Sequence, residues 1–434
     1  MKKVPSSVYR LQLNEAFTLK DATKLLPYLK ELGVEGVYCS PYFAAYSPHG
    51  YDIVDPTRLN PQVATPKDFD TFCKRLKELK LFHIADIVPN HMGIKGDNRW
   101  WQDVLEHGKD SKYASFFDIY WNGDKINIAL LGVPFEEASI KTVKKGKKRF
   151  YQYGDQYFPF NTEHYRLVHW LSFAQEPSYR RFFNINELVG VRIEDKKVLE
   201  AHHKWIFELL KKGKIDGLRV DHPDGLYDPK SYFDELRKKH KGLIVVEKIL
   251  GWGEELPPSW QVEGTVGYEY LNMLTGLFVK PSDKLTKVYS RFIGKEIDFE
   301  QLLLEKKKFY MVTEMAGDVK NLASKIPLHQ DLTRGDLVLG VYKLLAAFPV
   351  YRSYIRPRGS IPKRDIPYLE EAFSKARREN RELGSRVFDY LEEIFTLKRD
   401  TPALRDFLMR FQQLSAPIMA KGFEDITLYN YNRL

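Results

Sequence analysis

The chain has 434 residues, of which 43% are hydrophobic and 29% are charged, and only two are cysteine. This length predicts a globular protein of about two to three domains, and the cysteine count excludes a disulfide scaffold. No apolar run approaches the roughly 18 residues of a membrane span, and none follows Lys2 and Lys3, so we expect a cytoplasmic protein without a membrane partner.

The net charge of +10 raises nucleic-acid binding as a possible function. The lysines, however, gather in expected helix faces and hairpins, as in residues 144–148, which is typical of a solvated turn rather than of a phosphate-binding track. We therefore expect no nucleic-acid partner. Cys39 and Cys73 fall in an expected strand and an expected helix, and we interpret both as small buried apolar side chains.

Residues 1–90 alternate strand and helix patterns. The pattern predicts strands at 8–13, 37–40 and 82–88 and helices at 19–32 and from 66 onward. Thr18 and Asp21 form a capping box for the first helix, and Pro27 should kink that helix or reset its start. Thr65 caps the second helix, with Pro66 at its first position.

Residues 91–190 are aromatic-rich and irregular, with hairpin-like pieces at 125–131 and 149–160. The alternation then returns, with a helix at 198–210, a strand at 215–221, a helix at 230–240, a strand at 243–249 and a sixth strand ending near residues 264–268. The chain beyond is largely helical to about residue 413, and the charged segment 284–308 is expected to cover the barrel as a solvent-facing helical insertion.

Helices that stop at glycine and lead into buried strands are typical of a parallel barrel or a doubly wound sheet. Polar groups at the carboxyl ends of the strands favour an α/β fold of the (β/α)8-barrel type, whose chemistry lies at that rim. We predict about six barrel strands, a loop-rich domain inserted after strand 3 and a large helical insertion after strand 6. The expected parts are 1–90 and 191–275 for the barrel, 91–190 for the inserted domain and 276–434 for the helical subdomain.

The most informative stretch is 217–225, Gly-Leu-Arg-Val-Asp-His-Pro-Asp-Gly. Arg219 and Asp221 are two residues apart on an expected strand, so they point to the same side. A guanidinium should keep the Asp221 carboxylate ionised with a low pKa, and such an aspartate is suited to attack as a nucleophile. The alternative is a surface ion pair with no chemistry.

The buried run 243–249 brings Glu247 to the end of the neighbouring strand, where it is the natural acid/base partner of Asp221. A retaining glycosidase needs its two carboxyl groups roughly 5 Å apart, with the pKa of the acid raised. Adjacent barrel strands can supply that separation. The alternative is that Glu247 is a surface glutamate at the end of a strand, without a catalytic role.

Other polar residues are predicted at the same rim. Residues 86–91 place Asp86 near a barrel arginine, as a structural group, and offer hydroxyl-binding side chains to a sugar; residues 47–52 place a tyrosine ring for stacking and an aspartate for orienting a hydroxyl. Each could instead satisfy local backbone or cap a loop. The predicted substrate-binding residues are His49, Tyr51, Asp52, Asn90, His91, Arg219 and His222.

Neither metal-ligand spacing nor a glycine-rich nucleotide loop is present in the sequence, so we expect no metal and no cofactor.

Three stretches resemble conserved regions of the α-amylase superfamily: 86–91, 217–225 and 245–249. Further stretches resemble the maltooligosyl trehalose synthase family: 47–52, 179–188, 262–272, 348–354 and 419–425. The resemblance runs nearly from end to end. It implies a retaining intramolecular transglycosylation that converts the reducing-end α-1,4 linkage of a maltooligosaccharide into an α,α-1,1 linkage, with Asp221 and Glu247 as the catalytic pair.

The family resemblance also implies barrel strands 7 and 8 and a fourth conserved region with another aspartate, for which this sequence offers no match before Leu434. We therefore expect an incomplete barrel that a separate C-terminal chain could complete. Two alternatives stay open: an α-glucan hydrolase of the same superfamily, and a non-catalytic glucan-binding remnant.

Overall fold

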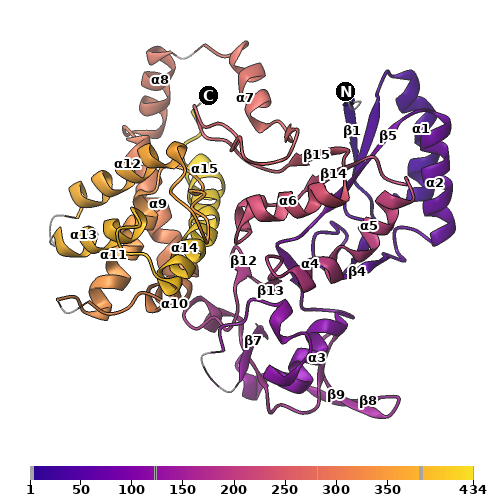
Figure 1. Ribbon diagram of the computed structural model, residues 1–434, viewed down its shortest axis with the longest axis horizontal. Coiled ribbons are helices and arrows are strands. Elements are labelled where there is room, and N and C mark those ends of the chain that lie inside the picture. The colour runs from indigo at the N-terminus through magenta and orange to yellow at the C-terminus, as the bar shows by residue number, and fades with distance from the viewer. Residues whose placement is uncertain are drawn as a thin grey trace. The chain divides into compact units, whose positions relative to one another are not determined.

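The computed structural model describes residues 4–121, 123, 125–280, 282–329, 331–380 and 385–433. The chain divides into two compact units (Figure 1). Unit 1 comprises residues 1–173, 177–248 and 256–266, and unit 2 comprises residues 174–176, 249–255 and 267–434. The four-part division expected from the sequence remains a prediction within these two units.

Unit 1 is built on a parallel sheet with the strand order β1-β2-β5-β14-β15-β16, six strands among the residues described. Every neighbouring pair is parallel. The strands are β1 (Val8–Leu11), β2 (Gly36–Cys39), β5 (Phe82–Ile87), β14 (Gly217–Val220), β15 (Leu243–Val246) and β16 (Gly264–Thr265). The sheet confirms the predicted incomplete (β/α)8-type barrel of about six strands.

Helices connect these strands: α1 (Leu19–Glu31), α2 (Pro66–Glu78), α4 (Lys196–His202), α5 (Lys204–Lys211) and α6 (Pro229–Lys239). The predicted capping box of Thr18 and Asp21 and the predicted Thr65 cap are both present, and α1 runs through Pro27 from its start at Leu19, so the proline does not reset it. The prediction of one helix over 198–210 was wrong, because the helix is interrupted at His203, whose ring hydrogen-bonds the Tyr232 hydroxyl of α6 at 2.8 Å.

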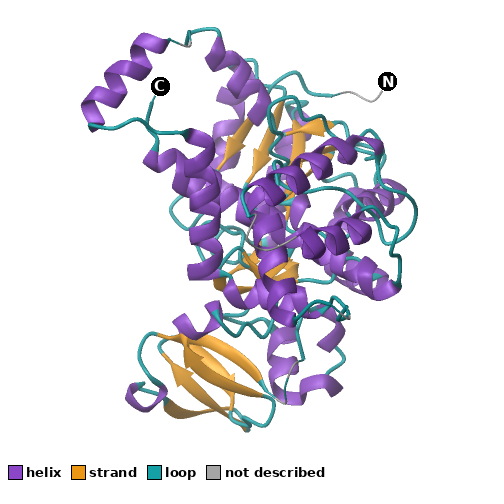
Figure 2. Ribbon diagram, turned by 90° about the vertical axis from the view of Figure 1, so that its left-hand side faces the viewer, coloured by secondary structure: helices purple, strands orange, loops and turns teal. Residues whose placement is uncertain are grey.

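A long excursion follows β5 and contains β6 (His91–Gly93), α3 (Arg99–His107), β7 (Ile126–Leu131), β8 (Lys141–Lys145), β9 (Lys148–Tyr153), β10 (Gln156–Pro159), β11 (Tyr165–His169), β12 (Arg181–Phe182) and β13 (Ile185–Gly190). Its strands form small sheets of their own, which Figure 2 shows in orange. The hairpin expected at 149–160 is present as β9 and β10. The one expected at 125–131 is not a hairpin, because β7 pairs in parallel with the more distant β11.

Unit 2 is helical, as predicted for the chain beyond strand 6. It contains α7 (Tyr268–Gly276), α8 (Asp283–Ile293), α9 (Phe299–Glu314), α10 (Ala316–Ser324), α11 (Arg334–Ala347), α12 (Ile366–Arg378), α13 (Ser385–Phe395), α14 (Pro402–Ala420), a π-helix (Lys421–Thr427) and α15 (Leu428–Asn430). The segment predicted to face solvent, 284–308, is divided: α8 buries no residue, whereas α9 buries Leu304, Lys307, Tyr310 and Met311.

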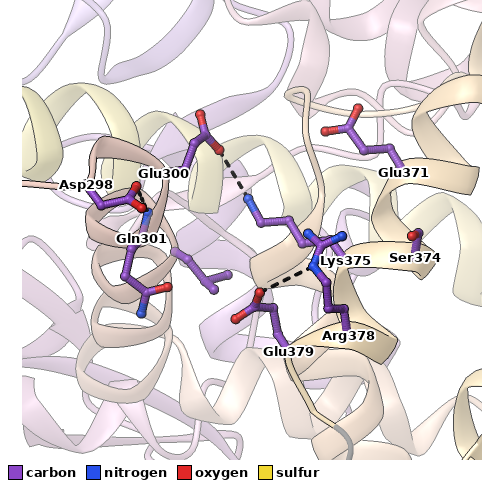
Figure 3. Close-up of a pocket in the computed structure, with 9 residues that line it drawn as sticks. Asp298, Glu300, Gln301, Glu371, Ser374, Lys375, Arg378 and Glu379 are labelled. Carbon is purple, nitrogen blue, oxygen red and sulfur yellow. Dashed lines mark hydrogen bonds and ion pairs between the residues drawn. The ribbon is translucent and has the colours of Figure 1, made fainter.

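A polar pocket of about 330 Å³ lies between α9 and α12 (Figure 3). Two ion pairs lie in its walls, with Glu300 bound to Lys375 at 3.2 Å and Arg378 bound to Glu379 at 3.7 Å. Lys307, also on α9, is buried and donates to the Phe348 carbonyl at 2.7 Å, and burial lowers the pKa of this lysine to about 7. These ion pairs explain the four charged side chains as structural contacts rather than as ligand-binding groups.

The cysteines and the absence of a long apolar helix were also considered in the sequence. Cys39 and Cys73 are both buried and free, as interpreted. In the parts of the chain that the structure describes, no helix has the length and apolar character needed to span a bilayer.

The buried pair His202 and His203 predicts acid sensitivity. Burial lowers the pKa of His202 to about 4, so between that value and the ordinary 6.5 the unfolded chain binds a proton that the folded chain does not. The contribution of the neutral His202 to the unfolding free energy is therefore fully present above pH 6.5 and is lost as the pH falls toward 4. Between pH 7 and pH 4 the unfolding free energy of the wild type should fall, and in His202→Gln this fall should be smaller by about 2–3 kcal/mol. Urea titration at both pH values measures it. Substituting the exposed His49 in the same way serves as the control, and an unchanged pH profile in His202→Gln contradicts the prediction.

Candidate active site

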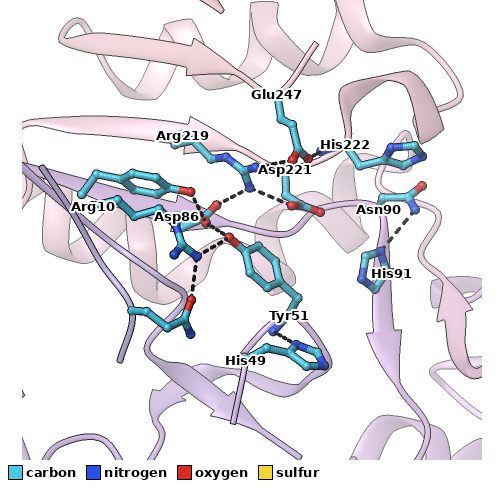
Figure 4. A network of polar contacts seen from close by, with 12 residues as sticks. Arg10, His49, Tyr51, Asp86, Asn90, His91, Arg219, Asp221, His222 and Glu247 are labelled. Carbon is cyan, nitrogen blue, oxygen red and sulfur yellow. Dashed lines mark hydrogen bonds and ion pairs between the residues drawn. The ribbon is translucent and has the colours of Figure 1, made fainter. Parts of the chain in front are cut away.

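Three neighbouring strands, β5, β14 and β15, deliver carboxylates to one end of the parallel sheet (Figure 4). Asp86 lies on β5, while Asp221 and Glu247 directly follow β14 and β15. The ladder continues through both, because Asp221 N–H donates to the Ile87 carbonyl and Glu247 N–H to the Val220 carbonyl, each at 2.9 Å. The three carboxylates are thus held by backbone pairing.

Arg219 is the common partner of these carboxylates. One terminal nitrogen, Nη1, lies 2.9 Å from Asp86 Oδ1 and 2.7 Å from Asp221 Oδ1, and the other, Nη2, lies 2.7 Å from Glu247 Oε1. Arg219, Asp86 and Asp221 are buried, and a quarter of the Glu247 side chain is exposed. The structure confirms that Arg219 and Asp221 face one side and that Asp86 holds a barrel arginine.

The low pKa expected for Asp221 was wrong. Burial and, after it, the nearby Glu247 carboxylate raise the pKa of Asp221 well above its ordinary value, against the opposing effect of Arg219. Burial also raises the pKa of Asp86, which Arg219 partly offsets. One guanidinium does not compensate three carboxylates in a dry pocket, so the cluster favours holding a proton.

Two tyrosines hold Asp86 through Oδ2, the carboxylate oxygen that Arg219 does not bind. The hydroxyls of Tyr51 and Tyr38 donate to Asp86 Oδ2 at 2.7 and 3.0 Å. Arg10 in turn donates to the Tyr51 hydroxyl at 3.3 Å. Burial, followed by the Asp86 charge, raises the pKa of Tyr38 to about 12, so this tyrosine stays a hydrogen-bond donor. The Tyr51 ring is thereby fixed by its hydroxyl.

Tyr38 and Arg10 were not predicted from the sequence as residues of the site. Tyr38 stands in register with Ile84 of the neighbouring strand, and Asp86 lies two residues beyond Ile84 and so on the same face. That alternation was readable from the two strand patterns, given their register. Arg10 on β1 carried no comparable signal.

The loop that carries Tyr51 is braced from within. Asp52 Oδ1 accepts the backbone N–H groups of Tyr46 and Ser47 at 3.2 and 3.0 Å, which occupies the oxygen in shaping the loop. His49 is exposed, and its Nδ1 accepts the Tyr51 N–H at 3.1 Å. A direct role of Asp52 in binding a hydroxyl remains a prediction.

Asn90 and His91 lie deeper than the sequence suggested, with relative exposures of 1% and 0%. Arg180, which the sequence reading did not single out, donates to Asn90 Oδ1 at 2.8 Å, and the Asn90 amide nitrogen lies 3.3 Å from His91 Nδ1. The His91 ring stacks on Phe182 with centroids 4.2 Å apart, and burial lowers the pKa of His91 well below its ordinary value. His91 is therefore neutral.

The turn after Asp221 is tightly constrained. His222 adopts a left-handed conformation with φ of +42°, and its N–H donates to Glu247 Oε2 at 3.1 Å. A Cβ on Gly225 would lie 2.4 Å from the His222 ring, so only glycine fits there. The buried Lys248 pairs with Asp224 at 3.2 Å and provides a second link between the two loops that carry Asp221 and Glu247.

Within the described ranges, no group of three or more His, Cys, Asp or Glu side chains has the arrangement of a metal site.

Comparison with known proteins identifies the family. The model of the α-amylase catalytic domain matches residues 5–326. The chain belongs to the α-amylase family. It is 32% identical over 459 residues to the putative maltooligosyl trehalose synthase of Mycobacterium tuberculosis, a match that covers 99% of this chain and 57% of that protein.

Solved structures give the same result. The maltooligosyltrehalose synthase of Arthrobacter ramosus matches with a TM-score of 0.88 and 33% identity, over 99% of this chain and 57% of that one. A hypothetical maltooligosyl trehalose synthase of Sulfolobus tokodaii matches with a TM-score of 0.83 and 31% identity, over 100% and 57%. This α-amylase family chain thus spans somewhat more than half the length of these relatives.

The raised pKa of Asp221 predicts a stabilising substitution in this family member. A carboxyl whose folded pKa exceeds its unfolded value contributes stability below the unfolded value, and that contribution is lost as pH rises through the folded value. Asp221→Asn should therefore raise the thermal midpoint at pH 7.5 by about 2–4 °C, or about 1 kcal/mol, and the gain should vanish near pH 4. Arg219 keeps Asp86 and Glu247 as partners.

The matched control is Asp224→Asn, three residues away. It removes a carboxylate from the buried Lys248 and should lower the midpoint at both pH values. A wild-type-like or lower midpoint of Asp221→Asn at pH 7.5 would show that the ionised Asp221 is not costly.

Proposed function

We propose that this chain is the catalytic portion of a maltooligosyl trehalose synthase. It would convert the α-1,4 linkage at the reducing end of a maltooligosaccharide into an α,α-1,1 linkage. The observation that carries the proposal is the Arg219 cluster, two strand-end carboxylates joined by one guanidinium, in a chain similar over 99% of its length to proteins of that name.

In the proposed reaction, Glu247 gives its proton to the glycosidic oxygen and Asp221 attacks the anomeric carbon. The bond to the terminal glucose breaks, and an ester between the glucan and Asp221 forms. The released glucose then rotates, and its own anomeric hydroxyl attacks the same carbon. Glu247 takes up the hydroxyl proton and the ester bond breaks, which restores both carboxyl groups.

The reaction requires protonation states that differ from those that the site favours in the structure. A nucleophilic Asp221 must be ionised, and an acidic Glu247 must carry a proton, whereas burial and the nearby Glu247 carboxylate favour a proton on Asp221. We propose that the two groups share one proton, which resides on Glu247 once sugar hydroxyls replace the Arg219 and His222 hydrogen bonds to that side chain. Arg219 then stabilises the ionised Asp221.

The predicted substrate-binding residues divide by exposure. His49, Tyr51 and His222 are exposed or partly exposed, and we propose that they contact the glucan directly. The other four are each less than a tenth exposed: Asp52, Asn90, His91 and Arg219. We propose that they position the exposed residues of the site and do not contact the glucan themselves. A separate C-terminal chain that completes the barrel is part of the same proposal.

An α-glucan hydrolase is the second candidate. It is favoured by a local match of 37% identity over 95 residues to the intracellular maltogenic amylase of Bacillus subtilis. In a hydrolase, water rather than the released glucose attacks the ester. A non-catalytic glucan binder is the third candidate, and it would bind maltooligosaccharide without turnover.

The test is an anomeric proton NMR time course with maltopentaose. The synthase predicts loss of the reducing-end signals and growth of an α,α-1,1 signal, whereas a hydrolase increases the reducing-end signals. Asp221→Asn and Glu247→Gln should each lower the rate by about 10³-fold or more. Glu255→Gln, at an exposed glutamate, is the control, and an equal loss in that variant would contradict the assignment.

A further inference from the structure

The excursion after β5 contacts the loop that carries Tyr51 through another tyrosine of that loop, Tyr46. The Tyr46 hydroxyl donates to Asp155 Oδ2 at 2.5 Å, although the two residues are 109 positions apart in the sequence. Asp155 lies in the two-residue turn between β9 and β10. The proposed reaction uses neither side chain, so the Tyr46–Asp155 contact needs an explanation of its own.

The Asp155 carboxylate is held in place to accept this hydrogen bond. Its other oxygen, Oδ1, accepts the side-chain N–H of Gln156 at 2.8 Å. The hydrogen bond from Tyr46 and, after it, the one from Gln156 hold the pKa of Asp155 below its ordinary value. The same contact with Asp155 raises the pKa of Tyr46 to about 12. At neutral pH a hydroxyl therefore donates to an ionised carboxylate, which is the stronger kind of hydrogen bond.

The turn after β6 holds the ring of Tyr46. Lys95 Nζ lies 5.3 Å from the centre of that ring. A Cβ on Gly96 would lie 3.6 Å from Tyr46 Cδ2, and the Gly96 N–H donates to Gln156 Oε1 at 2.9 Å. The turn after β6 and the turn after β9 are thus bound to each other as well as to Tyr46. The Tyr46–Asp155 contact is one part of a larger junction.

Tyr46 also closes the loop that carries Tyr51. Its N–H donates to Asp52 Oδ1 at 3.2 Å and lies 3.4 Å from the Asp52 carbonyl oxygen. Tyr51 directly precedes Asp52, and its hydroxyl donates to Asp86 Oδ2 at 2.7 Å (Figure 4). Tyr46 therefore joins the excursion to a loop whose far end reaches the carboxylate cluster.

We propose that the Tyr46–Asp155 contact positions residues 46–52 for binding a glucan. Tyr46 and Asp155 are positioning residues, which act through His49 and Tyr51 and do not touch the sugar. A loop that is ordered beforehand loses less conformational entropy when a ligand binds, so the contact raises the affinity for the glucan. The inference rests on the proposed function in taking a glucan as the ligand.

Amide hydrogen exchange of the ligand-free chain tests whether the contact orders the loop. Tyr46→Phe removes the hydroxyl and keeps the ring that Lys95 contacts. Exchange in residues 47–52 should become about threefold to tenfold faster. Asp155→Ala should have the same effect, and the double variant should show no further increase, because both changes remove one hydrogen bond. Asp155→Asn, which keeps an oxygen acceptor without the charge, should lie between. Tyr28→Phe, at an exposed tyrosine of α1, is the control.

Titration with maltopentaose tests whether the ordered loop serves binding. It is carried out in chains that also carry Glu247→Gln, in which turnover should be low. Tyr46→Phe should weaken binding by about threefold, because affinity falls with the fraction of chains whose loop is positioned. Tyr28→Phe should leave it unchanged. The urea midpoint should be the same in both variants, which separates a positioning role from a loss of folding.

Three outcomes overturn the inference. They are unchanged exchange in Tyr46→Phe, effects that multiply in the double variant, and a loop that exchanges faster while the affinity for maltopentaose stays the same. The two proposals fail separately, because exchange is measured without ligand. A chain with intact Tyr46 that binds no maltopentaose contradicts the proposed function, whereas a chain that binds and converts it equally well without the Tyr46 hydroxyl contradicts the inference alone.

Discussion

The site depends on one buried guanidinium that faces three carboxylates, two of them buried. Arg219 lies within 2.9 Å of Asp86, Asp221 and Glu247, and its two terminal nitrogens bind different members of the set. With one positive charge for three acids, the pocket cannot keep all of them ionised at low cost. The same imbalance that raises the pKa of Asp221 provides a proton that the proposed acid/base step uses.

The parallel sheet makes this arrangement possible. Residues in register on β5, β14 and β15 end at one rim, so an arginine and an aspartate two positions apart on the middle strand meet carboxylates from both neighbours. The loops then restrict the side chains: His222 in its left-handed conformation aims an N–H at Glu247, and Tyr38 and Tyr51 fix Asp86. Most of the polar groups at the rim therefore have little freedom to move.

Much of this could be predicted from the sequence, since strand periodicity and the Arg219–Asp221 spacing are local. The parallel barrel strands, the capped helices and the meeting of Asp86 with Arg219 all followed from such patterns. Properties that depend on distant partners did not follow. The Asp221 pKa depends on burial and on Glu247, and His203 and Asn90 form hydrogen bonds to Tyr232 and Arg180, which are distant in the sequence. β7 pairs in parallel with β11, which lies far along the chain, and no local hairpin pattern predicts that pairing.

Burial and the Glu247 carboxylate together raise the pKa of Asp221. Carbon-13 NMR of carboxyl-labelled aspartate, with Asp221→Asn to assign the signal, measures this pKa directly. We predict that Asp221 titrates well above 3.8 in the wild type and moves to lower pH in Glu247→Gln, where the neighbouring charge is gone. A wild-type titration at or below 3.8, or a titration that Glu247→Gln leaves unmoved, would contradict the shared-proton cluster.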